Sequence, residues 1–380
     1  MQKTVRGKDV ATGAALEVAF SDSITAVAGA AGGAEELYLA PGWIDVQVNG
    51  YAGVDYNSAR TSHEEIARSI EVLFATGVTR FYPTVITGAP DEMRGALENL
   101  ARAKDSLTHG GAMDGFHVEG PHISPEDGPR GAHLRRWVRR PDLEEFRRWQ
   151  DAARGNIRLV TLAPEWPEAP AYIEALVAQG VVISVGHTGA DTRQLADAVS
   201  AGATMSTHLG NGSHSVMRRH PNYLWEQLAE DRLTASFIVD GIHLPNSFLK
   251  SAVRAKGVAR SVLVTDASAP AGAKPGRYAL GEQEVDLTSD NRVVLAGQDK
   301  LAGSALSMDR AVGNAVRFAE ITLSDAVTMA TTNAARVGGV AGRQNGLALG
   351  DRADFVLFRW ERGVVGVRAT YVGGECVYRA

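Results

Sequence analysis

The sequence has 380 residues, of which 44% are hydrophobic and 22% are charged, so it can bury a large core and does not have the composition of a disordered chain. Its formal net charge of −5 and pI of about 6.1 provide no basic surface for nucleic acid and no polybasic attraction to a membrane. With a single cysteine, Cys376, no disulfide can form within the chain, and the first ten residues contain no apolar segment. Since no run of about 18 apolar residues follows, we expect a cytoplasmic protein without a signal peptide or a transmembrane helix.

Eight short apolar runs alternate with helical patterns through the middle of the chain. The predicted strands are 42–48, 78–84, 115–119, 158–164, 181–187, 204–208, 235–240 and 261–266. The predicted helices are roughly 62–76, 90–104, 141–154, 169–179, 191–201, 222–230 and 246–256. This alternation predicts the α/β class, with a (β/α)₈ barrel of the TIM type favoured over an open doubly wound sheet.

The two ends of the chain have a different pattern. Residues 1–40 contain short alternating segments, and residues 350–380 look like three short strands separated by turn residues. Neither end could bury a core alone, so we predict one small β-sandwich domain built from both termini, residues 1–40 plus 345–380. The barrel would then occupy residues 41–344, with a hairpin insert at about 273–300 after the eighth strand.

Polar side chains stand at the ends of several predicted strands. Glu119, His187, His208 and Asp266 end the third, fifth, sixth and eighth strands, and the carboxyl ends of barrel strands face the active site. Two histidines and one carboxylate at one mouth are a three-ligand metal set that leaves a position for water. Asp266 is placed to act as the general base that takes the proton of that water.

Each of these residues also has an ordinary structural interpretation. A lone histidine at a strand end is more often a hydrogen-bonded structural residue, and a lone aspartate is more often a helix N-cap. Four such residues at four neighbouring strand ends favour a shared site. His117 lies on the same strand face as Glu119, and we expect it to support the ligands from behind.

Several motifs in chain order resemble one family. They are PGWIDVQVNGYAGVD at 41–55, GFHVEGPHISPEDGPRGAH at 115–133, TLAPE at 161–165, GHTGAD at 186–191, THLGN at 207–211, VDGIH at 239–243, TDASAPAG at 265–272 and LAGSALSM at 301–308. From about residue 40 to residue 340 the chain resembles the N-acetylglucosamine-6-phosphate deacetylases of the amidohydrolase superfamily.

The resemblance implies roles for particular residues. Glu119, His187 and His208 match metal ligands, Asp266 matches the catalytic base, and His133 matches a histidine that polarises the acetamide carbonyl or orients the sugar. The matching substrate-binding positions are Gln47, Asn49, Ala132, His133, Asn211, Gly212, His243, Leu301, Ala302 and Gly303.

Gln47 and Asn49 stand where many amidohydrolases carry a histidine pair. Because an amide is a poor zinc ligand beside imidazole, we predict one divalent metal ion. We expect zinc, with iron, manganese and cobalt as alternatives for a set of one carboxylate and two imidazoles.

The loop after the sixth strand departs from the family pattern and reads THLGNGSHSVMRRHPNYLWEQLA. Arg219 has the spacing from His208 of the family's phosphate-binding arginine, and we predict that it binds phosphate; pairing with Glu226 or Asp231 is the alternative. In the family this loop reaches the neighbouring subunit, which implies a homodimer. His122 also departs from the pattern, and we interpret it as a loop histidine that faces water rather than as a sugar contact.

The leading hypothesis is metal-dependent hydrolysis of N-acetylglucosamine 6-phosphate to glucosamine 6-phosphate and acetate. The first alternative keeps the chemistry but changes the substrate to N-acetylgalactosamine 6-phosphate, an unphosphorylated acetamido sugar or another N-acyl compound. The second alternative is a non-catalytic barrel scaffold, which the presence of every expected ligand disfavours.

Overall fold

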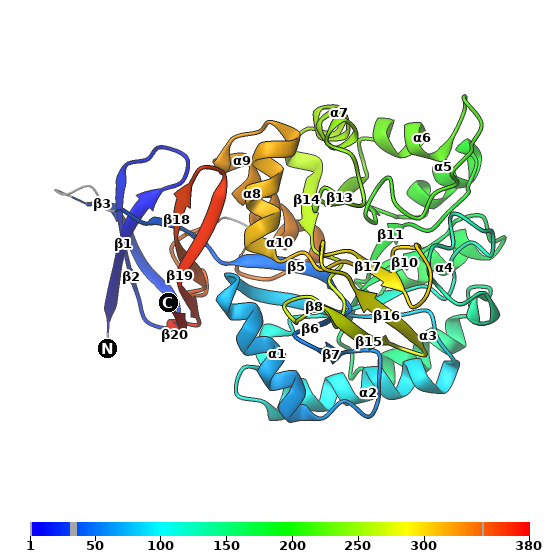
Figure 1. Cartoon of the computed structure of the whole chain (residues 1–380), viewed down its shortest axis with the longest axis horizontal. Helices are drawn as coiled ribbons and strands as arrows, with labels where there is room; N and C mark the ends of the chain where they lie inside the picture. The colour runs from blue at the N-terminus through cyan, green and yellow to red at the C-terminus, as the bar shows by residue number, and fades with distance from the viewer. Residues whose placement is uncertain (1, 31–35, 344–345) are drawn as a thin grey trace.

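The computed structural model describes residues 2–30, 36–343 and 346–380, and it consists of a large barrel with a small sheet at one end (Figure 1). The first and last strands of the chain both belong to that small sheet. The predicted boundary at 344/345, and residues 31–35 of the predicted N-terminal segment, lie outside the described residues. Within the described ranges, no helix has both the length and the apolar character needed to cross a bilayer.

Eight parallel strands in chain order form the central sheet. They are β5 (Trp43–Val48), β8 (Val78–Ile86), β9 (Phe116–Glu119), β10 (Ile157–Leu162), β11 (Val182–Val185), β12 (Met205–Ser206), β13 (Thr234–Ile238) and β14 (Ser261–Val264). A parallel bridge between Val48 and Ala267, and a 3.0 Å hydrogen bond from the Asp266 amide to the Gln47 carbonyl, join the ends of β5 and β14. The sheet is therefore closed, which confirms the predicted (β/α)₈ barrel and shows that the open-sheet alternative is wrong.

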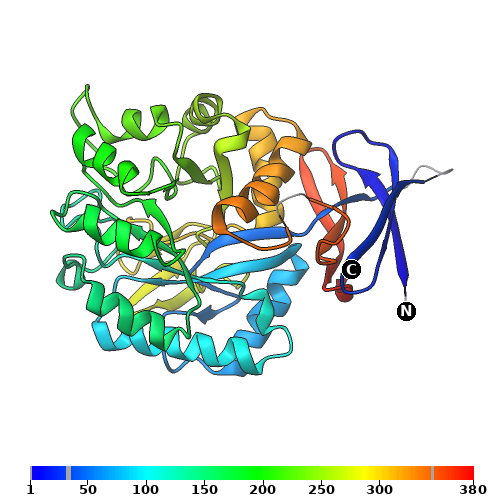
Figure 2. The ribbon, with the colours of Figure 1, turned by 180° about the vertical axis from the view of Figure 1, so that it is seen from behind.

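Helices cover the outside of the barrel (Figure 2). They are α1 (His63–Ala75), α2 (Pro90–Ser106), α3 (Leu143–Ala152), α4 (Ala169–Val177), α5 (Thr192–Ser200), α6 (Tyr223–Ala229), α7 (Asn246–Lys256), α8 (Met308–Ala319), α9 (Leu323–Ala330) and α10 (Thr332–Gly338). The first helix starts where its sequence predicts, because Ser62 and Glu65 form a capping box. Its buried face includes Ile66, Ile70 and Leu73, which recur at helical spacing and pack on the barrel.

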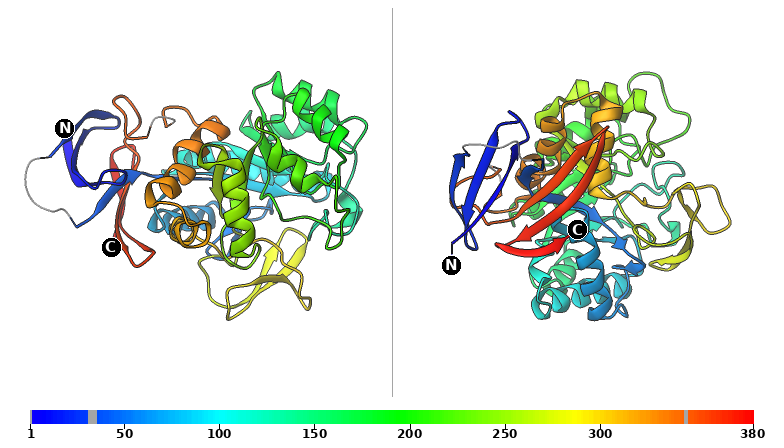
Figure 3. Two further views of the ribbon diagram at one scale, coloured as in Figure 1. Left: turned by 90° about the horizontal axis from the view of Figure 1, so that it is seen from above. Right: turned by 60° about the vertical axis from the view of Figure 1, so that its left-hand side comes forward.

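Strands from both ends of the chain make the small sheet, whose order is β20-β19-β18-β4-β1-β2-β3. These strands are β1 (Lys3–Asp9), β2 (Ala15–Phe20), β3 (Ile24–Gly29), β4 (Tyr38–Pro41), β18 (Phe355–Glu361), β19 (Val364–Val372) and β20 (Glu375–Arg379). Two strands, β4 and β1, lie between β2 and β18 in the sheet, yet the ring centroids of Phe20 on β2 and Phe355 on β18 are 4.9 Å apart. The sheet therefore curls over a shared core, as the predicted β-sandwich of both termini requires; the strands from the two ends lie side by side in Figure 3.

A buried ion network lies between the barrel and the small sheet. One carboxylate oxygen of Asp354, just before β18, lies 2.9 Å from Arg80 on β8 and 2.9 Å from Arg343. All three side chains are buried. The two positive charges hold the pKa of Asp354 below its usual value against the opposing effect of burial, which indicates that the network is ionised.

The predicted hairpin insert is a three-stranded antiparallel sheet that projects from the mouth of the barrel (Figure 3). Its strands are β15 (Gly276–Leu280), β16 (Gln283–Leu287) and β17 (Val293–Leu295), so the hairpin carries one strand more than predicted. Val285 and Val293 are fully buried in its own small core, against which Ile86 at the end of β8 and Ala132 pack. The insert is thus fixed to the barrel beside the strand ends. Two further short strands, β6 (Gly50–Tyr51) and β7 (Val54–Asp55), follow β5.

Candidate active site

The strand-end side chains of the barrel are turned into one mouth by an unusual backbone. Glu119 is the last residue of β9, and His187, His208 and Asp266 each follow their strand by two residues. His187, His208 and Asp266 have positive φ values of 49°, 29° and 50°. Non-glycine residues rarely adopt this conformation, and such strain persists mainly where the surroundings enforce it, often at functional sites.

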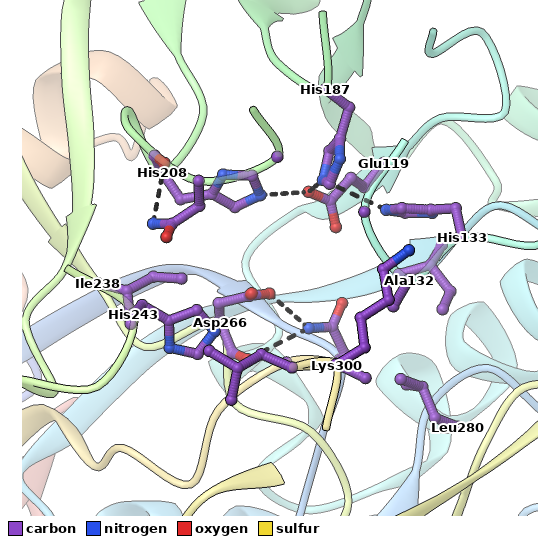
Figure 4. A pocket seen from close by; sticks show the side chains of 18 of the residues that line it. Glu119, Ala132, His133, His187, His208, Ile238, His243, Asp266, Leu280 and Lys300 are labelled. Atoms are coloured by element: carbon purple, nitrogen blue, oxygen red, sulfur yellow. Dashed lines mark hydrogen bonds and ion pairs between the residues drawn. The ribbon is translucent and has the colours of Figure 1, made fainter. Parts of the chain in front are cut away.

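Glu119 stands at the centre of a buried cluster (Figure 4). Its Oε1 lies 3.2 Å from His187 Nε2 and 3.0 Å from His208 Nε2, and it accepts a 3.0 Å hydrogen bond from Gln47 Nε2. Burial opposes ionisation of Glu119, but the two imidazoles outweigh it and lower its pKa well below the usual value. Burial also opposes charge on His208, but Glu119 outweighs it and raises the pKa of that imidazole. The negative charge of Glu119 therefore favours positive charge beside it in this cluster.

The donor set fits a divalent metal ion. Two ligand atoms held by one tetrahedral zinc at roughly 2.0–2.1 Å lie roughly 3.3 Å apart, close to the separations around Glu119. His187 Nδ1 lies 2.8 Å from the Pro129 carbonyl, which selects the tautomer that leaves Nε2 free to bind a metal. The buried carboxylate–imidazole cluster around Glu119 can therefore hold a metal ion.

His133 adds a fourth group to this cluster. Its Nε2 lies 3.3 Å from His187 Nε2, and the ligand atoms of Glu119, His133 and His187 also lie close enough together to hold an ion. Burial lowers the pKa of His133 to about 3, and the charge of His187 adds to this effect, so His133 is neutral. The tautomer of His187 leaves its Nε2 without a proton, so the facing Nε2 of His133 can carry one and donate it toward the centre of the cluster.

Asp266 lies across the cluster from the two histidines (Figure 4). Its Oδ1 accepts hydrogen bonds of 2.7 Å from Asn49 Nδ2 and 3.1 Å from Gln47 Nε2. Burial, followed by the negative charge of Glu119, raises the pKa of Asp266 to about 6. Gln47 thus donates hydrogen bonds to both carboxylates, and Asn49 orients Asp266. These two amides occupy the positions at which many amidohydrolases carry a histidine pair.

One cavity of about 390 Å³ contains most of the predicted site. The predicted residues that line it are Asn49, Glu119, Ala132, His133, His187, His208, Asn211, Gly212, His243, Asp266, Leu301, Ala302 and Gly303. Gln47, a predicted substrate-binding residue, does not line the cavity and instead donates hydrogen bonds to the carboxylates of Glu119 and Asp266. His243 Nδ1 lies 2.6 Å from Asp240 Oδ2, which fixes the orientation of that imidazole at the cavity wall.

Arg219 is placed apart from this cavity. It is exposed and does not line the cavity of its own chain. Its predicted alternative partner Asp231 instead pairs with Arg260, at 3.1 Å. Val216 and Trp225 in the same loop are also exposed, with 87% and 56% of their surface accessible.

The expectation that His122 faces water is wrong. The side chain is fully buried, with its ring 5.6 Å from that of Trp149 and 5.2 Å from that of Tyr172, and it is absent from the cavity wall. Burial lowers the pKa of His122 to about 4. Tertiary packing decided this outcome, because the imidazole lies against Trp149 of α3 and Tyr172 of α4, although the same loop later reaches the mouth at His133. His117 is buried behind Glu119 and lies 2.8 Å from Thr161, as its strand face predicts.

Sequence reasoning missed the contribution of the insert. Leu280, Gln283, Arg292 and Lys300 line the cavity, and all four come from the insert or its end. The available signal was that two of the four cations of the insert, Arg292 and Lys300, stand shortly before the predicted substrate-binding residues 301–303. Nothing in the spacing of these residues showed that the insert folds back over the mouth.

Comparisons with known proteins agree with this geometry. Residues 38–377 match the amidohydrolase family. The chain is 35% identical over 322 residues to N-acetylglucosamine-6-phosphate deacetylase of Bacillus subtilis, covering 84% of this chain and 80% of that protein. It is also 35% identical over 347 residues to N-acetylgalactosamine-6-phosphate deacetylase of a Shewanella species, covering 90% of this chain and 84% of that protein.

Solved structures show the same similarity in three dimensions. A mutant of N-acetyl-D-glucosamine-6-phosphate deacetylase from Mycobacterium smegmatis, in complex with N-acetyl-D-glucosamine-6-phosphate, superposes with a TM-score of 0.90. That chain is 32% identical in sequence, and the match covers 99% of each chain.

Proposed function

Because the chain belongs to the amidohydrolase family, we propose that it hydrolyses the acetamide of N-acetylglucosamine 6-phosphate to give glucosamine 6-phosphate and acetate. The observation that carries the proposal is the single cavity in which a buried carboxylate–imidazole cluster faces a separate carboxylate, Asp266. The similarity to deacetylases of this substrate over most of the chain supports it.

The metal centre is part of the proposal. Glu119, His187 and His208 would hold one divalent ion, most simply zinc, since the amides of Gln47 and Asn49 are poor ligands for a second. When bound, such an ion polarises a carbonyl and lowers the pKa of water to about 7. The alternative ligand set is Glu119, His133 and His187. The two sets differ only in one histidine, so metal retention would require His208 in the first set and His133 in the second.

The protein's own groups supply the proton transfers. Asp266 takes a proton from the attacking water at its free carboxylate oxygen and later delivers it to the departing amine of the sugar. Asn49 and Gln47 hold the other oxygen of Asp266, so the free oxygen faces the cavity. Neutral His133 can donate its Nε2 proton to the acetamide carbonyl oxygen, where negative charge develops.

The walls of the cavity would bind the sugar. Asn211, Gly212, His243 and residues 301–303 all line the cavity. Gly303 has a φ of +72°, and an added Cβ would lie 2.9 Å from Ser268, so this segment can pack against Ser268 only because residue 303 is glycine.

A direct assay tests the proposal. Release of acetate from N-acetylglucosamine 6-phosphate by the purified protein, lost on metal chelation and restored by zinc, iron, manganese or cobalt, is the expected result. No release with any of these metals would refute it. Parallel assays with N-acetylgalactosamine 6-phosphate address the second candidate, which the similarity to the Shewanella enzyme favours.

The assembly is proposed on separate grounds. The exposed apolar Val216 and Trp225 support a homodimer in which the 209–225 loop meets a second copy, and Arg219 would then serve the partner's cavity. Light scattering of the purified protein should give a mass of two chains; a mass of one chain would refute this arrangement. We expect the enzyme to act in the cytoplasm, where a single exposed Cys376 stays reduced.

A further inference from the structure

The insert of β15–β17 is built to hold a side chain over the cavity. Its apolar core packs against Ile86 and Ala132, and Gln283 Nε2 donates a 3.0 Å hydrogen bond to the Ala132 carbonyl. Arg136 and Glu282 form a 2.8 Å ion pair at its edge. The segment that follows β17 is therefore anchored to the loop that carries His133 on one side and to the barrel mouth on the other.

Lys300 lies at the end of this insert and lines the cavity. Figure 4 shows its ammonium pointing into the cavity, on the side of Ala132 and His133. The other cation of the insert that lines the cavity, Arg292, is paired with Asp299 at 2.8 Å. Among the residues that the structure describes, the ammonium of Lys300 has no hydrogen bond and no ion pair.

The surroundings of Lys300 are unfavourable for an unpaired cation. Partial burial lowers its pKa, the positive charge of Arg130 lowers it further, and Asp127 opposes this only as the smallest contribution. An anionic group in the cavity would relieve both the desolvation and the repulsion. The unpaired ammonium in the cavity wall is therefore available to a negatively charged group of a ligand.

We propose that Lys300 is a specificity-determining residue, which binds the anionic oxygens of a phosphorylated substrate from within the same chain. The inference rests on the proposed function for the identity of the substrate. It differs from the prediction for Arg219, which is exposed and outside its own chain's cavity. Lys300 lies in the cavity wall without any second subunit.

The kinetic test compares one phosphorylated and one unphosphorylated substrate. The Lys300→Gln variant should lower kcat/KM for N-acetylglucosamine 6-phosphate by about 10- to 100-fold, mainly through KM, since a charge-assisted hydrogen bond is lost. The Lys300→Arg variant, which keeps the charge, should recover most of this loss. In Lys300→Gln, activity on N-acetylglucosamine should fall much less than activity on the phosphorylated sugar, because the unphosphorylated sugar brings no anionic group to the ammonium.

A matched lysine provides the control. Lys274 lies in the same insert segment but is exposed and does not line the cavity, so Lys274→Gln should leave both activities unchanged. The proposal is overturned if Lys300→Gln stays within twofold of wild type on the phosphorylated substrate, or if both substrates lose activity equally.

Calorimetric binding separates this inference from the proposed function. Glucosamine 6-phosphate and glucosamine can be titrated into the wild-type protein and the Lys300→Gln variant, with no hydrolysis required. A preference for the phosphorylated sugar that falls about 10-fold or more in the variant supports the role of Lys300 even if no deacetylation occurs. If the wild-type protein and the Lys300→Gln variant prefer glucosamine 6-phosphate over glucosamine by the same factor, the role of Lys300 is overturned, whichever substrate the enzyme hydrolyses.

Discussion

Substitution of Asp266 by asparagine should separate catalysis from folding. Asp266 Oδ1 accepts hydrogen bonds from Asn49 and Gln47, and an asparagine carbonyl oxygen can accept both. In the described part of the chain, the other oxygen has no hydrogen bond and faces the cavity, so the asparagine NH₂ group replaces only the proton acceptor. The side chain should therefore keep its place while it loses its ability to take a proton.

The size of the effect follows from this geometry. Loss of a positioned general acid–base group costs roughly 10²- to 10⁴-fold in rate, so we expect kcat on N-acetylglucosamine 6-phosphate to fall by that factor. Stability should be equal or slightly higher, because burial and the charge of Glu119 both disfavour the ionised Asp266. Metal content should stay at the wild-type level.

The assay measures acetate release at pH 7.5, together with metal content by mass spectrometry and thermal unfolding by circular dichroism. Asp240→Asn is the matched control, since Asp240 also follows a barrel strand but pairs with His243 and does not line the cavity. We expect this control to affect KM more than kcat. An Asp266→Asn variant that keeps more than a tenth of wild-type kcat at equal metal content would refute the assignment of the base.

Three further results are expected. His208→Ala should lose bound metal in equilibrium dialysis whereas His133→Ala should retain it; the opposite pattern would assign the metal to the alternative ligand set. Because the buried His122 has a pKa of about 4, below the usual value of about 6.5, the unfolded chain takes up the proton first and stability falls as pH drops from 6.5 toward 4. Urea unfolding at pH 7.5 and pH 5 should therefore show a loss that is about 2 kcal/mol smaller in His122→Gln than in wild type, and equal losses would contradict the burial of a neutral imidazole. Asp354→Ala leaves the buried guanidinium of Arg343 without its carboxylate, and leaves Arg80 paired with Asp114 alone, so it should lower the free energy of unfolding by about 3–5 kcal/mol. Arg254→Gln, a change in an exposed pair, should cost under about 1 kcal/mol; similar losses in both variants would refute the importance of the network.

The local pattern of apolar residues was sufficient to predict the strands and helices of the barrel. Period-two and period-3.6 apolar patterns are properties of neighbouring residues, so the eight strands and the helix that starts at the Ser62–Glu65 capping box could be predicted before any contact was known. The strand-end rule then brought Glu119, His187, His208 and Asp266 to one mouth, because parallel strands in a closed barrel direct their carboxyl ends to the same side.

Tertiary structure alone decided the positions of side chains on long loops. His122 and Lys300 both lie in polar loop sequence, yet one is buried under two helices and the other points into the cavity. Likewise, Arg219 has the spacing expected for phosphate binding but is exposed. Loop direction depends on packing between segments far apart in the chain, such as Gln283 on Ala132, and no local period records those contacts. The amino-acid sequence by itself therefore determined the barrel and which residues meet at its mouth, whereas the folded chain decided which loop charges face a substrate.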